Sequence, residues 1–203
     1  MPEPPAELYG RHADEFDSRT KLDALPEEFH ALLESFVDAL PGPAVLDAGC
    51  GPGRDCEYFH TRGLDPIGVD IADGMIDYAR THRSGEYLRM DIRDLAFDAD
   101  RFDGVWCPAS VFFVPDEEMA VALNEFSRVL RPEGVARIGF KIGDGPVEVE
   151  KWGETTVEYH VSEDEARELL EAAGFRVQSV TVNQVSPGRT FANFSCRQPV
   201  SDP

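Results

Sequence analysis

AVLDAGCGPGRD, at residues 44–55, decides the fold of this chain. Its first half is apolar and predicts a buried strand that ends at Asp47, and the glycines that follow predict a tight loop opening into a helix. Glycine lets the backbone turn sharply and brings N–H groups against a bound ligand. In an open α/β sheet, ligands bind outside the carboxyl ends of the strands, where this loop would lie. The stretch therefore predicts a strand, a helix and between them a loop, at Gly49, Gly51 and Gly53, that binds a nucleotide-like ligand.

The glycine loop differs from the dinucleotide-binding fingerprint GxGxxG at two positions. The third glycine, Gly53, comes one residue early, and Arg54 occupies the sixth motif position. Asp47 would lie close to a pyrophosphate, and two negative charges at that distance repel each other unless a metal separates them. A cationic group suits Asp47 better, so we expect a ligand with an adenosine half and an amino-acid half. Asp70 supports this expectation, because it lies 21 residues after Gly49, at the end of the next predicted strand, where a carboxylate accepts hydrogen bonds from ribose hydroxyls.

The sequence on both sides of this loop alternates between strand and helix patterns. A helical stripe from Phe29 to Leu40 precedes the loop. Short apolar runs predict parallel strands at residues 44–48, 66–71, 86–90, 102–107 and 134–142, and helical patterns lie between them at 54–62, 73–82 and 116–130. A further helix begins at the capping box Ser162-Glu163-Asp164-Glu165 and ends before Gly174.

The C-terminal part leaves this alternation. RVQSVTVNQV and TFANFSCR are strand-like, and the four residues 186–189 between them are too few for a helix, so we expect an antiparallel hairpin. The fold class is therefore α/β, a doubly wound, mostly parallel seven-stranded sheet with an antiparallel last strand. We expect a single domain over residues 1–203, with residues 1–40 as a helical arm and 143–161 as an insertion. Residues 7–20 carry only two isolated aromatics, Tyr9 and Phe16, which predicts that this part of the arm packs loosely and is mobile.

The composition and charge of the chain limit the kinds of partner that it is expected to bind. The formal net charge of −20 disfavours nucleic acid and anionic membranes. Only Lys21, Lys141 and Lys151 are lysines, so the acidic surface also fits a protein from a high-salt cytoplasm, and an ordinary acidic protein stays the alternative. The four cysteines have neither disulfide nor zinc-site spacing, so we expect no metal. The chain carries no leader pattern and no membrane span, and we expect a cytoplasmic protein.

Several of these motifs, in their order, resemble the class I S-adenosylmethionine-dependent methyltransferases, closely over residues 44–142 and loosely over nearly the whole chain. VLDAGCGPG is similar to the family's glycine motif, GVDIADGMIDYAR to its ribose-binding strand and following helix, and MDIRDL to its adenine segment. FDGVWCPASVFFVP is similar to its fourth-strand motif, and RVLRPEGV to the turn before its fifth strand. The resemblance implies a Rossmann-like methyltransferase fold and S-adenosyl-L-methionine as cofactor.

The resemblance also implies where the cofactor lies. Gly49 and Gly51 would contact its methionine part, Asp70 its ribose, and Asp91 its adenine amino group. Tyr9 and Phe16 resemble the aromatic lid of small-molecule members, and Cys107 would line the methyl-donor site. The full set of expected cofactor-binding residues is Tyr9, Asp47, Gly49, Cys50, Gly51, Asp70, Ile71, Met75, Asp91, Ile92 and Cys107.

The acceptor side matches the family less well. Many small-molecule members carry a histidine two residues before the proline of the fourth-strand motif, where this chain has Phe113, and no DPPY or NPPY motif follows the fourth strand. We expect the acceptor pocket to be formed by Phe112, Phe113, Lys141 and Trp152, with His160 as a proton acceptor beside Tyr159. The predicted function is methyl transfer to a small-molecule acceptor by in-line displacement. A non-catalytic cofactor-binding module and a nicotinamide-dependent oxidoreductase stay open as alternatives.

Overall fold

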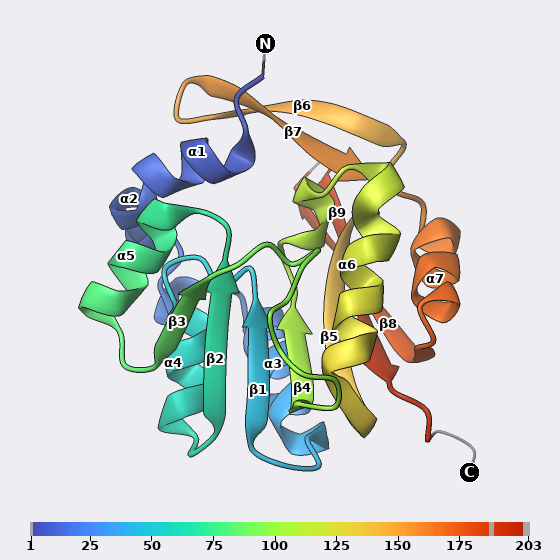
Figure 1. Cartoon of the computed structure of the whole chain (residues 1–203). Coiled ribbons are helices and arrows are strands. Elements are labelled where there is room, and N and C mark those ends of the chain that lie inside the picture. Colours follow the sequence, from blue (N-terminus) through green and yellow to red (C-terminus); the bar gives the residue numbers. More distant parts are fainter. Residues whose placement is uncertain (1, 187–188, 201–203) are drawn as a thin grey trace.

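A seven-stranded sheet forms the centre of the molecule, as Figure 1 shows for the computed structural model, which describes residues 2–186 and 189–200. The strand order is β3-β2-β1-β4-β5-β9-β8, and only β9 runs against its neighbours. This confirms the predicted doubly wound sheet and its antiparallel hairpin, whose turn at residues 187–188 lies outside the described part of the chain. The strands of the sheet are β1 (Ala44–Ala48), β2 (Asp65–Asp70), β3 (Glu86–Arg89), β4 (Phe102–Cys107), β5 (Leu130–Ile142), β8 (Arg176–Ser186) and β9 (Arg189–Arg197).

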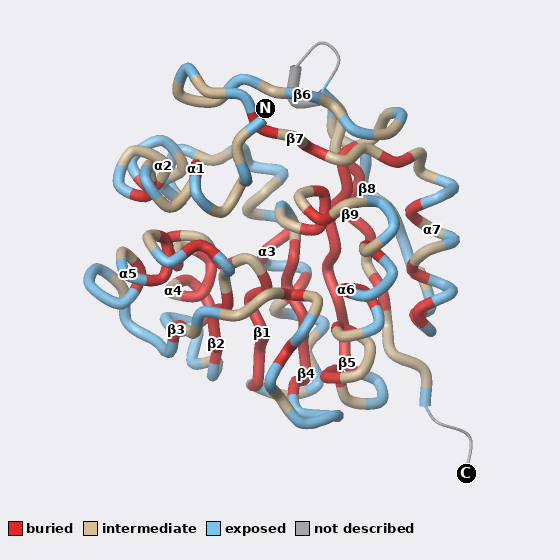
Figure 2. Tube along the Cα trace, turned by 45° about the horizontal axis from the view of Figure 1, so that its top comes forward, coloured by how far each residue is buried: buried red, intermediate tan, exposed pale blue. Residues whose placement is uncertain are grey.

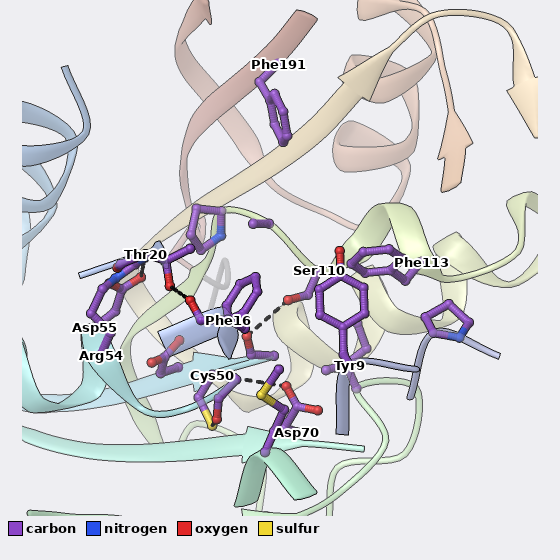
Figure 3. A pocket seen from close by; sticks show the side chains of 18 of the residues that line it. Tyr9, Phe16, Thr20, Cys50, Arg54, Asp55, Asp70, Ser110, Phe113 and Phe191 are labelled. Atoms are coloured by element: carbon purple, nitrogen blue, oxygen red, sulfur yellow. Dashed lines mark hydrogen bonds and ion pairs between the residues drawn. The ribbon is translucent and has the colours of Figure 1, made fainter. Parts of the chain in front are cut away.

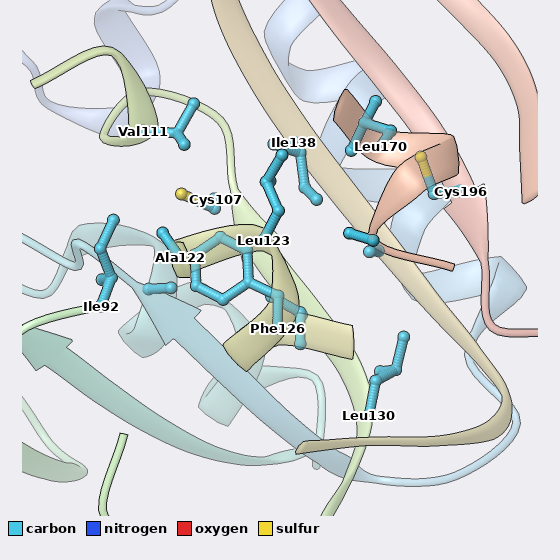
Figure 4. Packing of buried hydrophobic residues seen from close by; sticks show 14 of the residues in the cluster. Ile92, Cys107, Val111, Ala122, Leu123, Phe126, Leu130, Ile138, Leu170 and Cys196 are labelled. Carbon is cyan, nitrogen blue, oxygen red and sulfur yellow. The ribbon is translucent and has the colours of Figure 1, made fainter. Parts of the chain in front are cut away.

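Helices cover both faces of the sheet, because successive residues of each strand point to opposite faces. Val45 and Trp106 pack on one face with α3 and α4, whereas Leu46 and Cys107 pack on the other with α6 and α7. Figure 2 shows that burial is concentrated in the central strands, and Figure 4 shows the packing of the larger cluster. The helices are α3 (Glu27–Ala39), α4 (Arg54–Thr61), α5 (Asp73–His82), α6 (Asp116–Val129) and α7 (Glu163–Ala172), and a short 3-10 turn, η2 (Val111–Phe113), follows β4.

The last helix begins and ends at the predicted residues. The Ser162 side chain accepts a hydrogen bond from the Glu165 backbone N–H, and the Glu165 side chain accepts one from the Ser162 backbone, so the capping box is complete. Gly174 follows the helix with φ +93°, in the left-handed region that favours glycine. The local sequence alone sets both ends of α7.

The N-terminal arm packs more firmly than the sequence predicts. It forms α1 (Pro5–Arg11), α2 (Ala13–Arg19) and the 3-10 turn η1 (Leu22–Ala24) before α3. Leu8 is fully buried, and a Cβ on Gly74 of α5 would lie 2.0 Å from the carbonyl oxygen of Gly10. The prediction of a loosely packed arm was wrong, because a leucine and two facing glycines, rather than the two aromatics alone, bring α1 into contact with α5.

The insertion at residues 143–161 is a β-hairpin that lies beside the arm in Figure 1. Its strands β6 (Gly145–Lys151) and β7 (Glu154–His160) form a separate two-stranded antiparallel sheet. The Glu3 N–H donates to the Thr155 carbonyl oxygen at 2.8 Å, and the Thr156 hydroxyl donates to the Glu3 carbonyl oxygen at 2.8 Å. The chain's N-terminal residues are therefore tied to a segment about 150 positions later.

The helices in residues 2–186 and 189–200 include none with the length and apolar character that a membrane-spanning helix requires.

Candidate active site

A cavity of about 1000 Å³ lies at the carboxyl ends of β1, β2 and β4, between the sheet and the N-terminal arm. Figure 3 shows Asp70 and Cys50 from the sheet side of this cavity, Tyr9 and Phe16 from the arm, and Phe191 from β9. Every predicted cofactor-binding residue except Cys107 lines it: Tyr9, Asp47, Gly49, Cys50, Gly51, Asp70, Ile71, Met75, Asp91 and Ile92. The structure thus gathers residues from four separate parts of the chain.

The glycine loop has the backbone conformation that its sequence predicts. Gly49 and Gly51 have φ values of +77° and +53°, in the left-handed region. A Cβ on Gly49 would lie 1.9 Å from the Ser110 hydroxyl oxygen, so no side chain fits there. At Gly51 the nearest side-chain atoms to such a Cβ are 3.9 Å and 4.0 Å away, on Phe16 and Met75. Gly49 therefore allows the loop after β4 to approach, and Gly51 faces the cavity.

Asp70 is fixed by two backbone hydrogen bonds at the end of β2. Its Oδ2 accepts from the Gly51 N–H at 3.0 Å, and its Oδ1 accepts from the Ala72 N–H at 2.8 Å. Burial raises the pKa of this carboxyl group, although both backbone hydrogen bonds act in the opposite direction. Each carboxylate oxygen has a second lone pair. The carboxylate is thus held in one orientation beside the cavity, with acceptor capacity left for two hydroxyl groups.

Asp47 is the opposite case, a buried carboxylate with an unsatisfied oxygen. The residue is 2% exposed, and its Oδ2 has no hydrogen-bond partner in the described part of the chain. Burial raises the pKa of Asp47 well above its usual range, and the nearby Asp55 raises it further. A buried carboxylate is costly unless a cation or hydrogen-bond donors compensate it. Since Asp47 lines the cavity, it fits a ligand with a cationic group, such as the ammonium of an amino acid.

Arg54 and Asp55 line the cavity where the glycine loop enters α4, and sequence reasoning did not assign them a role. Arg54 donates from Nε to Asp55 Oδ1 at 2.6 Å and from Nη2 to Asp55 Oδ2 at 3.0 Å. Its Nη1 donates to the Thr20 carbonyl oxygen at 3.0 Å, and the Trp106 indole N–H donates to Asp55 Oδ2 at 2.9 Å. The pair therefore connects the glycine loop with the arm and with β4. Its position directly after Gly53 was the only signal in the sequence.

Asp91 lies at the cavity as predicted, but its carboxylate already accepts hydrogen bonds from Arg93. The Arg93 backbone N–H and Nε each donate to Asp91 Oδ1 at 2.9 Å, and the guanidinium also contacts Glu118. These hydrogen bonds lower the pKa of Asp91, so the group is ionised. A ligand that binds Asp91 would share its carboxylate with Arg93, and the hydrogen bonds from Arg93 set the orientation of that carboxylate.

Cys107 does not line the cavity, and that prediction was wrong. Its side chain is fully buried in the cluster between the sheet and α6, near Val111, as Figure 4 shows. The physical reason is strand alternation, because Cys107 shares its face of the sheet with Leu46 and Val105. Burial raises the pKa of its thiol to about 12, which makes it a core residue rather than a reactive one.

Of the predicted acceptor residues, only Phe113 lines the cavity; Phe112, Lys141, Trp152, Tyr159 and His160 do not. Lys141 is 4% exposed and forms a buried ion pair with Glu158 of β7. Its ammonium group lies 4.8 Å from the ring centre of Phe112, and His160 Nε2 lies 3.5 Å from Glu158 Oε2. These residues connect the inserted hairpin to the sheet and do not face an acceptor. The sequence did not reveal this, because it gave no register for the hairpin.

β9 supplies a further part of the cavity wall, which sequence reasoning did not assign to the site. Phe191 and Asn193 lie two residues apart on β9 and both line the cavity. Asn193 is 7% exposed, and its Oδ1 has no hydrogen-bond partner within the described residues. The FANF pattern of residues 191–194 predicts only a strand, and the pairing of β9 with β5 brings it to the cavity.

Comparison with known proteins agrees with this geometry. Residues 45–134 match the model of a family described as a methyltransferase domain. The chain is 34% identical over 131 residues to the malonyl-[acyl-carrier protein] O-methyltransferase of Salmonella typhimurium, a match covering 64% of this chain and 50% of that protein. It is 37% identical over 126 residues to the ubiquinone biosynthesis O-methyltransferase of Hahella chejuensis, covering 58% and 52% of the two chains. The matched region thus spans about half the length of these curated relatives.

Solved structures share the fold. The 1,6-didemethyltoxoflavin-N1-methyltransferase of Burkholderia thailandensis, crystallised with bound 1,6-didemethyltoxoflavin and S-adenosylhomocysteine, superposes with a TM-score of 0.73 at 20% identity, covering 98% of this chain and 92% of that one. A methyltransferase from Methanosarcina mazei superposes with a TM-score of 0.74 at 21% identity, covering 87% and 99%. These structures thus share the fold of the chain, and the match of residues 45–134 to a methyltransferase domain, together with the curated relatives, supports a class I S-adenosylmethionine-dependent methyltransferase.

Proposed function

We propose that this chain binds S-adenosyl-L-methionine and transfers the methyl group to a small-molecule acceptor. The observation that carries the proposal is the pair of carboxylates beside one glycine loop. Asp47 has an unsatisfied buried oxygen that suits the cofactor's ammonium group, and Asp70 has a fixed carboxylate that suits the two ribose hydroxyls. Ile71 and Met75 supply apolar surface for the adenosine on the same side of the cavity. The described residues thus fit both halves of the cofactor.

The cofactor, when bound, supplies a methyl group that a sulfonium already activates for displacement. The protein mainly has to hold the acceptor atom in line with it, and such positioning lowers a reaction barrier by about 7–11 kcal/mol. Among the described residues that line the cavity there is neither a histidine nor a lysine. Burial raises the pKa of Tyr9, the tyrosine that lines the cavity, so its hydroxyl stays protonated. The carboxylates that line the cavity are weak bases, so the site suits an acceptor that is already a nucleophile, such as a neutral amine, which releases its proton to water after the transfer, or a ring nitrogen.

The cavity wall also lacks an unpaired cation among its described residues. Its two arginines, Arg54 and Arg93, are paired with Asp55 and Asp91. A free carboxylate such as the one that a malonyl-carrier methyltransferase modifies would find no unpaired positive charge here. We therefore favour an uncharged acceptor with an apolar body, packed against Phe113 and Phe191 and hydrogen-bonded to the Asn193 amide.

A cytoplasmic location and the absence of a nucleic-acid partner belong to the same proposal. The net charge of −20 would repel a phosphate backbone. The four cysteines are free and buried, as in a reducing compartment.

Calorimetric titration in high-potassium buffer tests the proposal, with S-adenosylhomocysteine and NAD as separate ligands. We expect binding of S-adenosylhomocysteine and none of NAD, because Asp47 lies where a pyrophosphate would be repelled. Binding of NAD alone would overturn the proposal in favour of an oxidoreductase. A second experiment offers labelled S-adenosylmethionine with amines, aza-heterocycles, phenols, thiols and carboxylates, and turnover of none of them would favour a non-catalytic binding module.

A further inference from the structure

The turn of the inserted hairpin carries a tryptophan in a conformation that tryptophan rarely adopts. Trp152 and Gly153 connect β6 to β7, and their φ values are +51° and +80°. Lys151 and Glu154 pair across this two-residue loop. Such loops favour asparagine or glycine at the first position, because a side chain is strained in the left-handed region. A bulky residue persists there only when its surroundings compensate the strain.

The compensating contacts come from the N-terminal arm. The Trp152 ring meets Tyr9 edge to face at 5.2 Å and 87°, and it stacks on His12 at 4.6 Å and 3°. Tyr9 in turn meets Phe113 at 5.3 Å, and both of these residues line the cavity, whereas Trp152 does not. Trp152 therefore lies behind the cavity wall, in contact with a residue that forms it.

Polar contacts hold the same two segments together. Arg11 Nη2 lies 2.9 Å from Glu154 Oε2, and the Glu3 N–H donates to the Thr155 carbonyl oxygen at 2.8 Å. The other end of the hairpin is fixed to the sheet by the buried ion pair of Lys141 with Glu158. The hairpin thus links the sheet to the arm, and its turn together with the first residues of β7 makes the contacts to the arm.

We propose that Trp152 is a positioning residue that, through Tyr9 and His12, holds the arm closed over the bound cofactor. The inference rests on the proposed cofactor site and extends it. It implies that cofactor exchange requires the arm to separate from the hairpin turn. The hairpin then sets the residence time of the cofactor without touching it.

Two substitutions of Trp152 distinguish the effect of the aromatic ring from the effect of the strained turn. Trp152→Asn removes the ring and relaxes the turn, since asparagine tolerates positive φ, whereas Trp152→Phe keeps an aromatic ring in the same strained turn. Glu148→Gln, on an exposed position of β6, is the matched control. We expect Trp152→Asn to weaken S-adenosylhomocysteine binding about tenfold, which corresponds to about 1.4 kcal/mol, mostly through faster dissociation. Trp152→Phe and Glu148→Gln should bind within about threefold of the wild type, under 1 kcal/mol by the same conversion.

The design distinguishes this inference from the proposed function. A wild-type chain that does not bind S-adenosylhomocysteine would refute the proposed function itself. A wild-type chain that binds it, with Trp152→Asn showing the same affinity and dissociation rate, would refute only the role of Trp152. If Trp152 acts through Tyr9, the effect of Trp152→Asn should largely disappear in a Tyr9→Ala background, and full additivity of the two would also count against the inference.

Discussion

At the scale of single residues, two aspartates at the carboxyl ends of the adjacent strands β1 and β2 acquire different properties from their neighbours. Asp70 accepts hydrogen bonds from two backbone N–H groups, so its carboxylate is oriented before any ligand binds. Asp47 has a buried oxygen with no partner among residues 2–186 and 189–200, so it is destabilising until a cation arrives. Asp70 therefore offers a ligand an oriented hydrogen-bond acceptor, and Asp47 offers it a negative charge.

Substitution of Asp70 by alanine tests the geometric role. A hydrogen bond to a charged group contributes about 1.5–3 kcal/mol, so S-adenosylhomocysteine should bind about 10- to 100-fold more weakly. Asp77→Ala, on the exposed side of α5, is the matched control and should bind like the wild type. An Asp70→Ala chain that remains folded and binds with unchanged affinity would remove Asp70 from the site.

Substitution of Asp47 by asparagine should have opposite effects on stability and binding. Because burial raises the pKa of Asp47 in the folded chain, its contribution to stability is full at low pH and is lost as the pH rises through the raised value. Asparagine avoids that loss, so the unliganded variant should melt at a higher temperature than the wild type at neutral pH. Its affinity for S-adenosylmethionine should fall at least tenfold, because the ammonium loses its partner.

The pH dependence provides the check on Asp47. Wild-type affinity for S-adenosylmethionine should weaken as the pH falls through the raised pKa of Asp47, since the protonated carboxyl no longer attracts the ammonium. This dependence should be absent in Asp47→Asn. A variant that is less stable than the wild type at neutral pH would show that the carboxylate is not strained in the unliganded protein.

At the scale of elements, the arm forms the wall of the cavity opposite the sheet, and a segment far away in the sequence supports it from outside. The arm supplies Tyr9 and Phe16, which line the cavity, and the hairpin β6–β7 packs on the arm from outside. The hairpin is attached to the sheet through Glu158, which is 1% exposed and paired with Lys141. The position of the arm therefore depends on a buried ion pair in another element.

Breaking that ion pair should be costly, because it leaves one buried charge uncompensated. Glu158→Ala should destabilise the chain by about 3–5 kcal/mol, measured by denaturant unfolding. The double variant Lys141→Met, Glu158→Leu removes both charges and should be substantially milder, since apolar residues of similar volume often replace a buried pair without loss. A double variant as unstable as Glu158→Ala would show that the charges are not the cause.

At the scale of the whole molecule, the most prominent feature is the formal net charge of −20. Like charges spread over one small domain destabilise the compact state through mutual repulsion, and salt screens this repulsion within about 3 Å at 1 M. The acidic surface still suits the proposed cofactor, which carries a positive sulfonium and would be attracted to the cavity.

The melting temperature should therefore rise between dilute buffer and molar KCl. Sucrose at equal osmolality is the control, because it stabilises by exclusion from the surface but does not screen charge. A rise with KCl that exceeds the rise with sucrose would support the hypothesis of a high-salt source. An equal rise in melting temperature in KCl and in sucrose would indicate an ordinary acidic protein.

The sequence by itself determined the sheet, the glycine loop and the residues proposed for the cofactor half of the site. The apolar runs of β1 and β2, the glycines between β1 and α4 and the capping box at Ser162 are patterns within a few residues, so the local sequence predicts them, although the two strands pair with each other across about 20 residues. The cofactor half is also built at the ends of adjacent parallel strands, which the topology places together.

Only the tertiary structure decided the residues proposed for the acceptor half and the cover of the cavity. Asn193 reaches the cavity because β9 pairs with β5 in one register, and Trp152 reaches Tyr9 because the hairpin packs on the arm. Cys107 was misplaced for the same reason, since the face that a strand residue occupies depends on what packs against the sheet. These contacts join segments separated by up to about 150 residues, and no local pattern encodes the packing that brings them together.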